Sequence, residues 1–286
     1  MRRAGYWVAY GLVVGALGLG GAELLVRVLG LAPHLPNQYA AYREDPVLPH
    51  RLRPGVVLEG RSVTGEFDFH YAHNSHGMRD VERRLEKPAG VFRVLALGDS
   101  FTYGAGVGFE DTFLAGLERT LNQRDGSHPP VEVVKAGVPR YFPEAERLFL
   151  EHYAAPFDAD LVLVVFVPND VIDTYLGVDA IEVLPDGRLI SNYGRRLLAQ
   201  LGPGLLALYE HLHLARIPIR WVLQTRLRNE EPARWEEIYR AEGFHEEAWQ
   251  EVEAHYTGMT DWARRQGTEI AFLHIPLRGP WDARHR

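Results

Sequence analysis

Short apolar segments alternate with amphipathic segments from Val91 onward, and this alternation restricts the fold more than any other feature of the 286-residue chain. The apolar segments are typical of strands at 91–97, 131–137, 159–167 and 268–276. The amphipathic segments predict helices at 110–126, 143–155 and 245–267. Strands that alternate with helices predict an α/β domain on a doubly wound parallel sheet, with right-handed crossovers.

The N-terminal segment has a different character. Ala4–Ala22 contains no charged residue, and as a helix these nineteen residues span about 28 Å, close to the roughly 30 Å hydrocarbon core of a bilayer. Small residues before Glu23 also suit a cleaved signal peptide. Apolar helical spacing continues to Leu31, which favours a membrane anchor over residues 1–31. Arg2 and Arg3 favour a cytoplasmic N-terminus, with the remainder of the chain exported across the membrane.

Two other segments fall outside the alternating pattern. Residues 32–90 are rich in Pro, Arg and His, and we interpret them as an extracytoplasmic connector with short strands. Residues 171–244 separate the third strand from the last helix by far more than an ordinary crossover loop, and they include an amphipathic helix pair. We interpret 171–244 as a helical insertion over the strand ends of a domain at 91–286.

The composition excludes several classes of function. The chain has 31 Lys and Arg against 38 Asp and Glu, a formal charge of −7, and it contains no long basic stretch, so nucleic acid is not an expected partner. It has no cysteine, and therefore no thiolate nucleophile and no Cys-ligated metal. The histidines at 211–213 and 245 lack the spacing of a zinc-binding helix, and the glycines at 104–108 lack dinucleotide-binding spacing. We expect no metal and no cofactor.

Polar and small residues follow three of the predicted strands at the point where each strand ends. "GDS" (98–100) follows the first strand, "AG" (136–137) ends the second, and "PND" (168–170) follows the third. Each has an ordinary structural explanation, as a helix N-cap or a turn. Ligands of open parallel sheets bind beyond the carboxyl ends of the strands, however, so three such groups at one edge indicate a site.

The same residues carry a resemblance to a known family. "GDSFTYG" (98–104), the glycine of "VVKAGVP" (133–139) and "FVPND" (166–170) resemble the first three blocks of the SGNH (GDSL-type) hydrolases, and "NSHGMRD" (74–80) resembles a segment of membrane-anchored bacterial members. The resemblance implies a flavodoxin-like fold with Ser100 as nucleophile. It also implies an oxyanion hole from the Ser100 and Gly137 N–H groups and the Asn169 amide. Pro168 departs from the stricter third block, which has glycine two residues before Asn169.

This resemblance implies serine-dependent hydrolysis of O-acyl esters through an acyl-enzyme on Ser100. The expected substrate is an acylated glycan or a lipid-like ester at the cell envelope. Two alternatives stay open at this stage. The same serine can serve an O-acyltransferase with a sugar hydroxyl as acceptor, and a non-catalytic envelope binding or assembly protein can retain the fold.

The catalytic base is the least defined element of this hypothesis. The family pattern ends with Asp-x-x-His, and Asp282 and His285 match this spacing. The loop after a fourth parallel strand emerges at the same sheet edge as Ser100, so His285 can reach the hydroxyl. The alternative is a chance pair in the charged tail of a C-terminally shortened chain, since the family normally has another strand before this block and a helix after it. In that case we expect weak or no ester turnover.

Overall fold

The computed structural model describes residues 2–32, 40–61, 67–123, 128–191, 195, 198–240 and 244–276. The chain divides into two compact units, each formed by two separate stretches of sequence. Unit 1 consists of Met1–Gln38 and Ile190–Arg240, and unit 2 consists of Tyr39–Leu189 and Ala241–Arg286. The division into anchor, connector and hydrolase-like domain stays a prediction, as does the role of 171–244 over the strand ends.

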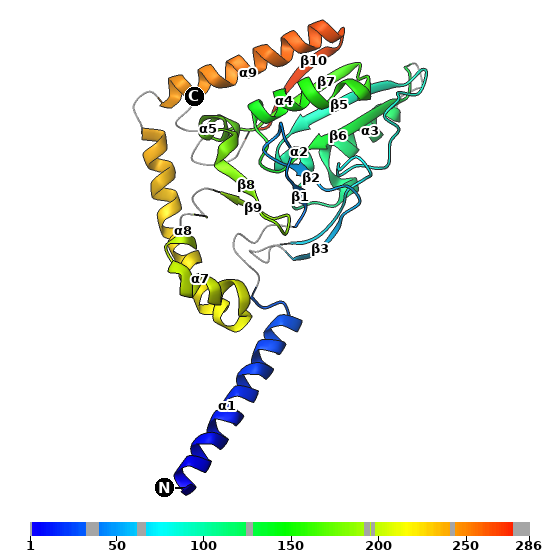
Figure 1. Ribbon diagram of the computed structural model, residues 1–286. Coiled ribbons are helices and arrows are strands. Elements are labelled where there is room, and N and C mark those ends of the chain that lie inside the picture. Colours follow the sequence, from blue (N-terminus) through cyan, green and yellow to red (C-terminus); the bar gives the residue numbers. More distant parts are fainter. Residues whose placement is uncertain are drawn as a thin grey trace. The chain divides into compact units, whose positions relative to one another are not determined.

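Unit 2 contains a parallel sheet of four strands in the order β10-β7-β5-β6 (Figure 1). The strands are β5 (Phe92–Gly98), β6 (Val131–Gly137), β7 (Leu161–Phe166) and β10 (Glu269–His274). All neighbouring pairs run parallel, which confirms the predicted α/β fold. Strand β5 comes first of these four in the sequence and lies between β6 and β7 in the sheet. The chain therefore changes direction across the sheet after β6. Such a switch point is where open α/β sheets bind ligands.

Helices cover both faces of this sheet because successive strand residues point to opposite sides. Val94 and Ala96 of β5 belong to one apolar cluster with Leu114. Leu95 and Leu97 belong to a second, larger cluster with side chains from two helices on the other face. The helices of unit 2 are α2 (Ser100–Tyr103), α3 (Phe113–Asn122), α4 (Pro143–Tyr153), α5 (Asn169–Leu176) and α9 (Phe244–Gln266), with short 3-10 turns at Phe109–Asp111, Ala155–Phe157 and Val178–Ala180. Leu114 lies on α3, and the larger cluster includes residues of α4 and α9.

Most of the segment expected to be a connector belongs to unit 2. Its strands form two antiparallel pairs, β1 (Tyr42–Arg43) with β2 (Arg51–Leu52), and β3 (Val57–Arg61) with β4 (Asp68–Ala72). Apolar side chains of this segment are buried in the larger cluster of the sheet domain, namely Ala41, Tyr42, Leu48, Leu52, Tyr71 and Met78. The segment therefore shares its core with the sheet.

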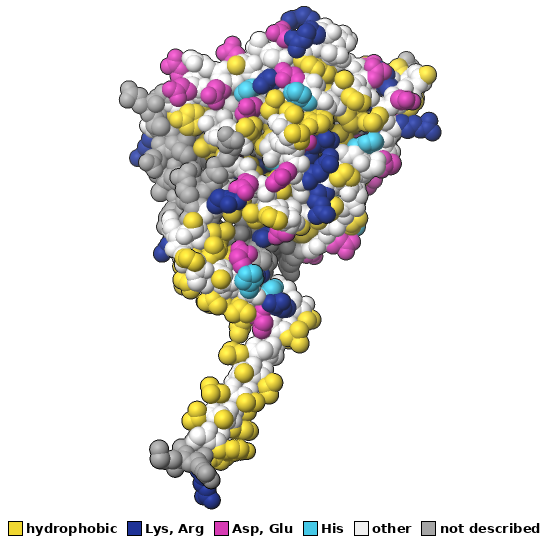
Figure 2. All heavy atoms as spheres, in the orientation of Figure 1, with side chains coloured by type: hydrophobic (Ala, Val, Ile, Leu, Met, Phe, Trp, Pro, Cys, Tyr) yellow, Lys and Arg dark blue, Asp and Glu magenta, His cyan; other side chains and the backbone are white. Residues whose placement is uncertain are grey.

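Unit 1 contains α1 (Arg2–Val28), α7 (Gly202–His211) and α8 (His213–Arg240). Gly5–Val28 of α1 is long and apolar enough to cross a membrane, and its large apolar side chains other than Val26 are exposed along its length (Figure 2). Tyr209 of α7 and Leu223 of α8 are buried in a small apolar cluster. The short pair β8 (Ile181–Val183) and β9 (Leu189–Ser191) lies at the boundary between the units in the sequence.

A buried ion network joins the 74–80 segment to the sheet. Asp80, whose side chain is fully buried, accepts hydrogen bonds from Lys135 Nζ (3.0 Å) and Arg83 Nε (2.7 Å). Glu118 of α3 accepts from the same two side chains, each at 2.8 Å. Breaking one member of a buried ion pair leaves the partner charge without compensation, which costs far more than loss of a surface pair.

We therefore expect Asp80→Asn to lower the free energy of unfolding by about 3 kcal/mol, measured by urea unfolding in detergent micelles. The matched control is Glu110→Gln, which removes an exposed carboxylate 3.7 Å from Arg119 and is expected to change stability by less than about 1 kcal/mol. Equal effects of the two variants would contradict a structural role for the network.

Candidate active site

The turn after β5 places Ser100 at the edge of the sheet. Asp99 is the N-cap of α2, and its Oδ1 accepts the Phe101 N–H at 2.8 Å while its carbonyl accepts the Tyr103 N–H at 2.9 Å. Aspartate is a preferred N-cap because its carboxylate satisfies an N–H that the helix leaves free. Asp99 is buried, whereas Ser100, the first helical residue, is partly exposed. Asp99 therefore caps a helix, which is the ordinary structural explanation of "GDS". Ser100, the first residue of that helix, stays accessible.

Two glycines let the backbone approach α2 closely. Gly98 and Gly137 are register partners at the ends of β5 and β6. A Cβ at Gly137 would lie 2.4 Å from the Tyr103 nitrogen and 2.5 Å from the Thr102 carbonyl carbon, which are backbone atoms that cannot rotate away. Gly98 has φ of 153°, a conformation that other residues rarely adopt. The structure therefore places Gly137 directly against the helix that begins with Ser100.

Asn169 completes the set at the end of β7. It is the first residue of α5, and its Nδ2 lies 3.3 Å from Asp99 Oδ2 and 3.3 Å from Asp173 Oδ2. The structure thus brings the Ser100 turn, Gly137 and Asn169 together, as the sequence predicts. Both amide hydrogens of Asn169 are directed at carboxylates, so an oxyanion at this place would compete with Asp99 or Asp173 for one of them.

Asp173 lies against the candidate site through its contact with Asn169, and the sequence did not point to it. It lies four residues after Asn169, one helical turn along α5, and it is buried. Burial raises the pKa of Asp173, and the positive charge of Arg140 opposes this rise. Arg140 has φ of 72°, a conformation uncommon outside glycine. Burial also raises the pKa of Asp99, against the hydrogen bonds from Phe101 and Asn169 that lower it.

Two further buried carboxyl groups, Glu146 and Asp170, interact electrostatically with each other and with Asp99. Glu146 of α4 is fully buried, and within the described residues neither of its carboxyl oxygens has a hydrogen-bond partner. Asp170 is equally buried; its Oδ2 accepts the Val167 N–H at 2.8 Å, and its Oδ1 has no partner in the same residue set. Burial raises the pKa of both groups well above the ordinary value, and the negative charge of Glu146 raises that of Asp170 further. Burial therefore favours the protonated form of both groups.

The sequence contains a signal for Glu146. It precedes Phe149 by three residues and Leu150 by four, and both of these are buried. This spacing places the glutamate on the apolar face of the helix, where a carboxyl group loses water.

The structure does not position the predicted base. Asp282 and His285 lie outside the described residues, so their role stays a prediction. Two described histidines are engaged in the core. His50 Nε2 lies 2.9 Å from the Pro139 carbonyl oxygen, and burial lowers the pKa of His50 to about 4. His73 Nε2 lies 2.9 Å from the Tyr103 hydroxyl. Within the described stretches of the chain, the Ser100 hydroxyl has no hydrogen-bond partner.

No group of three His, Cys, Asp or Glu residues suited to hold a metal ion occurs among the residues that the structure describes. The described groups at this edge of the sheet are the Ser100 hydroxyl, the Asn169 amide, backbone N–H groups and the carboxyl groups of Asp99 and Asp173.

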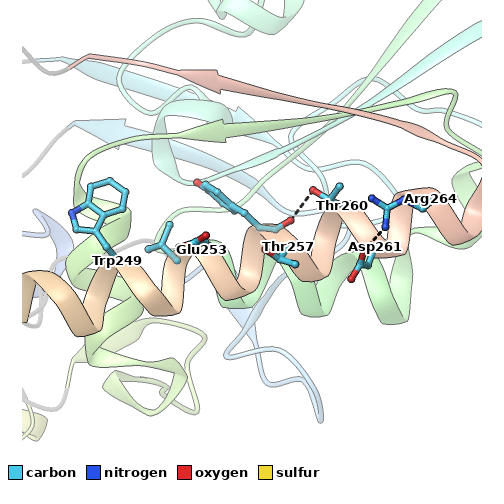
Figure 3. A pocket seen from close by; sticks show the side chains of 8 residues that line it. Trp249, Glu253, Thr257, Thr260, Asp261 and Arg264 are labelled. Carbon is cyan, nitrogen blue, oxygen red and sulfur yellow. Dashed lines mark hydrogen bonds and ion pairs between the residues drawn. The ribbon is translucent and has the colours of Figure 1, made fainter.

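A separate pocket lies along α9 (Figure 3). Its volume is about 420 Å³. Trp249 lies at one end, and Asp261 and Arg264, which form an ion pair, lie at the other. None of its lining residues follows a strand of the sheet, and it includes neither Ser100 nor Asn169.

Comparisons with known proteins give distant similarity only. No protein-family model and no curated protein matches the chain. A mutant of the esterase AlinE4 is 15% identical with a TM-score of 0.29, over 65% of this chain and 77% of that one. LAE5, an alpha/beta hydrolase enzyme from the metagenome of Lake Arreo, Spain, is 15% identical with a TM-score of 0.28, over 63% of this chain and 75% of that one. Similarity at this level does not assign a function.

The carboxyl pair predicts a pH dependence of stability. Below the ordinary carboxyl pKa, near pH 4, folded and unfolded chains both bind these protons, and the pair costs little. As the pH rises above this value the unfolded chain releases the protons first, because the folded pKa values of Glu146 and Asp170 are raised. Stability is therefore lost progressively as the pH rises toward the folded pKa values.

We expect Glu146→Gln to reduce the loss of unfolding free energy between about pH 5 and pH 8, because it removes one of the two titrating groups. Urea unfolding followed by tryptophan fluorescence at both pH values measures this difference. Glu151→Gln, on the same helix but in a half-exposed pair with Arg147, is the control and should keep the wild-type pH slope. If the unfolding free energy of Glu146→Gln depends on pH as that of the wild type does, the pKa of Glu146 is not raised in the folded chain.

Proposed function

We propose that this chain is a membrane-anchored serine esterase of the SGNH type, which hydrolyses O-acyl esters at the cell envelope. One observation carries the proposal: an accessible serine begins a helix at the end of β5, with Gly137 and Asn169 delivered to the same place by the neighbouring strands. Three strand ends that converge on one hydroxyl are expected of a nucleophile and its oxyanion hole.

The reaction begins when a base takes the Ser100 proton and the oxygen attacks the ester carbonyl carbon. Negative charge then develops on the former carbonyl oxygen. The N–H groups of Ser100 and Gly137 and the Asn169 amide would donate to this oxygen. The base returns its proton to the departing alcohol, and water then releases the acyl group from Ser100 by the same steps in reverse. We assign the base to His285, oriented by Asp282, on the spacing of the family motif.

The Asn169 contacts fit this role. Its hydrogen bonds to Asp99 and Asp173 hold the amide near the Ser100 turn before substrate arrives. Protonation of a carboxyl group with a raised pKa weakens its hold on an amide hydrogen, so Asp173 can release one hydrogen to the oxyanion.

The proposed position of the chain at the membrane favours a substrate in the cell envelope. We propose that α1 crosses the cytoplasmic membrane with Arg2 and Arg3 inside, so that the rest of the chain lies outside. An enzyme tethered there meets acylated glycans and lipid esters, which are the substrate classes we propose.

We expect Ser100→Ala to abolish hydrolysis of p-nitrophenyl acetate and to prevent labelling by a fluorophosphonate, because both reactions need the hydroxyl. Peptide mass spectrometry of the labelled wild type should place the adduct on Ser100. Ser75→Ala is the matched control, since it removes a serine hydroxyl that bonds Glu82 at the surface of the same unit. A wild type that neither reacts nor turns over esters would favour a non-catalytic envelope protein that retains the fold.

We expect Asn169→Ala to lower kcat by about two to three orders of magnitude with a smaller effect on KM, the usual result of losing one oxyanion donor. Asn122→Ala is the control, because that amide bonds the backbone of α3 and of Val131, at the end of β6 opposite to Gly137. A change confined to KM would instead make Asn169 a substrate-binding residue.

A further inference from the structure

The end of α1 is attached to the turn between α7 and α8 by charged hydrogen bonds. Glu23 Oε1 accepts the His213 N–H at 2.9 Å, and Glu23 Oε2 accepts the Leu214 N–H at 2.7 Å. These are the first residues of α8, whose N–H groups have no partner within the helix. Arg27 donates to Glu23 at 2.7 Å and to the His211 carbonyl at 2.8 Å, at the end of α7. One pair of side chains on α1 therefore satisfies the ends of both helices.

A buried arginine strengthens this junction. Arg216 of α8 donates to the carbonyl of Ala32, just beyond α1, at 2.8 Å. It also donates to the carbonyls of Tyr209 (2.7 Å) and Glu210 (2.9 Å) in the last turn of α7. The α7–α8 hairpin, defined here as residues 202–226, is thus held against the end of α1 by bonds from three different side chains.

The α7–α8 hairpin presents an apolar face to its surroundings. Leu205 and Leu208 are three residues apart on α7, with Leu212 directly after the end of that helix, and Ile217 and Trp221 are four residues apart on α8. These five side chains are between 41% and 68% exposed. The last turns of α1 and the residues after it carry exposed apolar side chains as well, namely Leu24, Leu25, Val28, Leu29 and Leu31. Figure 2 shows apolar side chains along α1 and again on the neighbouring hairpin.

The depth of Glu23 and Arg27 indicates what covers this face. If the nineteen uncharged residues Ala4–Ala22 fill the hydrocarbon core, Glu23 and Arg27 lie at the level of the lipid headgroups. The hairpin turn, bonded to both, lies at the same level. Helices with exposed Leu and Trp at this depth bury their apolar side in the headgroup and acyl boundary.

We propose that the α7–α8 hairpin lies in the membrane interface beside α1 and inserts Leu208, Ile217 and Trp221 among the lipids of that leaflet. The occupant of the apolar face is the lipid itself, because the face is continuous with a helix that already contacts lipid. The inference depends on the proposed membrane crossing of α1, and not on the esterase activity. Unit 1 is then attached to the membrane by two elements, a crossing helix and an interfacial hairpin.

The absence of cysteine allows a direct test on the full chain. Single variants Leu208→Cys and Ile217→Cys are labelled with the fluorophore NBD and reconstituted into vesicles of phosphatidylcholine and phosphatidylglycerol. We expect blue-shifted emission that is quenched by lipids with a spin label on the acyl chain, and protection from aqueous iodide. Glu210→Cys is the matched control, since Glu210 lies two residues from Leu208, on the opposite side of α7. Its label should be quenched by iodide.

A fourth label, at Leu17→Cys on α1, separates the two proposals. If Leu17 is not quenched by lipid, α1 does not cross the bilayer and both proposals fail. If Leu17 is quenched while Leu208 and Ile217 respond only to iodide, the crossing stands and the interfacial hairpin is wrong. Labels at Leu208 and Ile217 protected from both quenchers would show that protein, such as a second copy of this chain, covers the face, which also overturns the inference.

Discussion

Hydrogen bonds between β5 and its neighbours align the carboxyl ends of three strands. Gly98 lies opposite Gly137 on β6, and Leu97 lies opposite Val164 on β7. A slip of one residue in either pair would turn buried side chains to the wrong face, so the apolar cores on both sides fix this register. The site follows from it, because Ser100 and Asn169 stand within a few residues of these partners. Burial of the strands thus fixes where the residues of the candidate site lie.

Buried charge has two different roles in unit 2. In the network of Asp80, Lys135, Arg83 and Glu118, each charge has opposite partners within 3.0 Å, and the network joins the 74–80 segment to the sheet. Glu146 and Asp170 have carboxyl oxygens without a hydrogen-bond partner among the described residues, and burial raises the pKa of both groups, which favours their protonated forms. The first arrangement contributes stability as ion pairs. The carboxyl groups of Glu146 and Asp170 are expected to make stability depend on pH. They interact electrostatically with Asp99, which lies beside the residues proposed to bind substrate.

The sequence predicted the sheet strands closely, since strands buried on both faces are continuously apolar. The predicted 131–137 strand matches β6, and 268–276 extends beyond β10 by one residue at its start and two at its end. The predicted 110–126 helix was less accurate. Thr112 caps α3 by accepting the Ala115 N–H, so the regular helix begins later, after a 3-10 turn.

The strand-end rule also predicted that Ser100, Gly137 and Asn169 lie at the same edge of the sheet. It could not locate Asp173 or the pairing of Glu146 with Asp170, because these depend on the packing of α4 and α5, which no local pattern reports. The burial of side chains from the segment predicted as a connector at 32–90 could not be predicted either, because this segment has no continuous apolar run. Its few large side chains, such as Tyr42 and Tyr71, are buried against residues distant in sequence, and composition does not reveal such contacts.

The junction in unit 1 has a consequence for the order of events during synthesis. Glu23 and its partner His213 are separated by 190 residues, which a ribosome takes roughly 10–40 s to add at about 5–20 residues per second. During that interval Glu23 and Arg27 have only each other, as an i,i+4 pair on α1. Helix α1 therefore leaves the ribosome long before its partners on α8, and strands β5, β6 and β7 can form in the interval before these contacts are made.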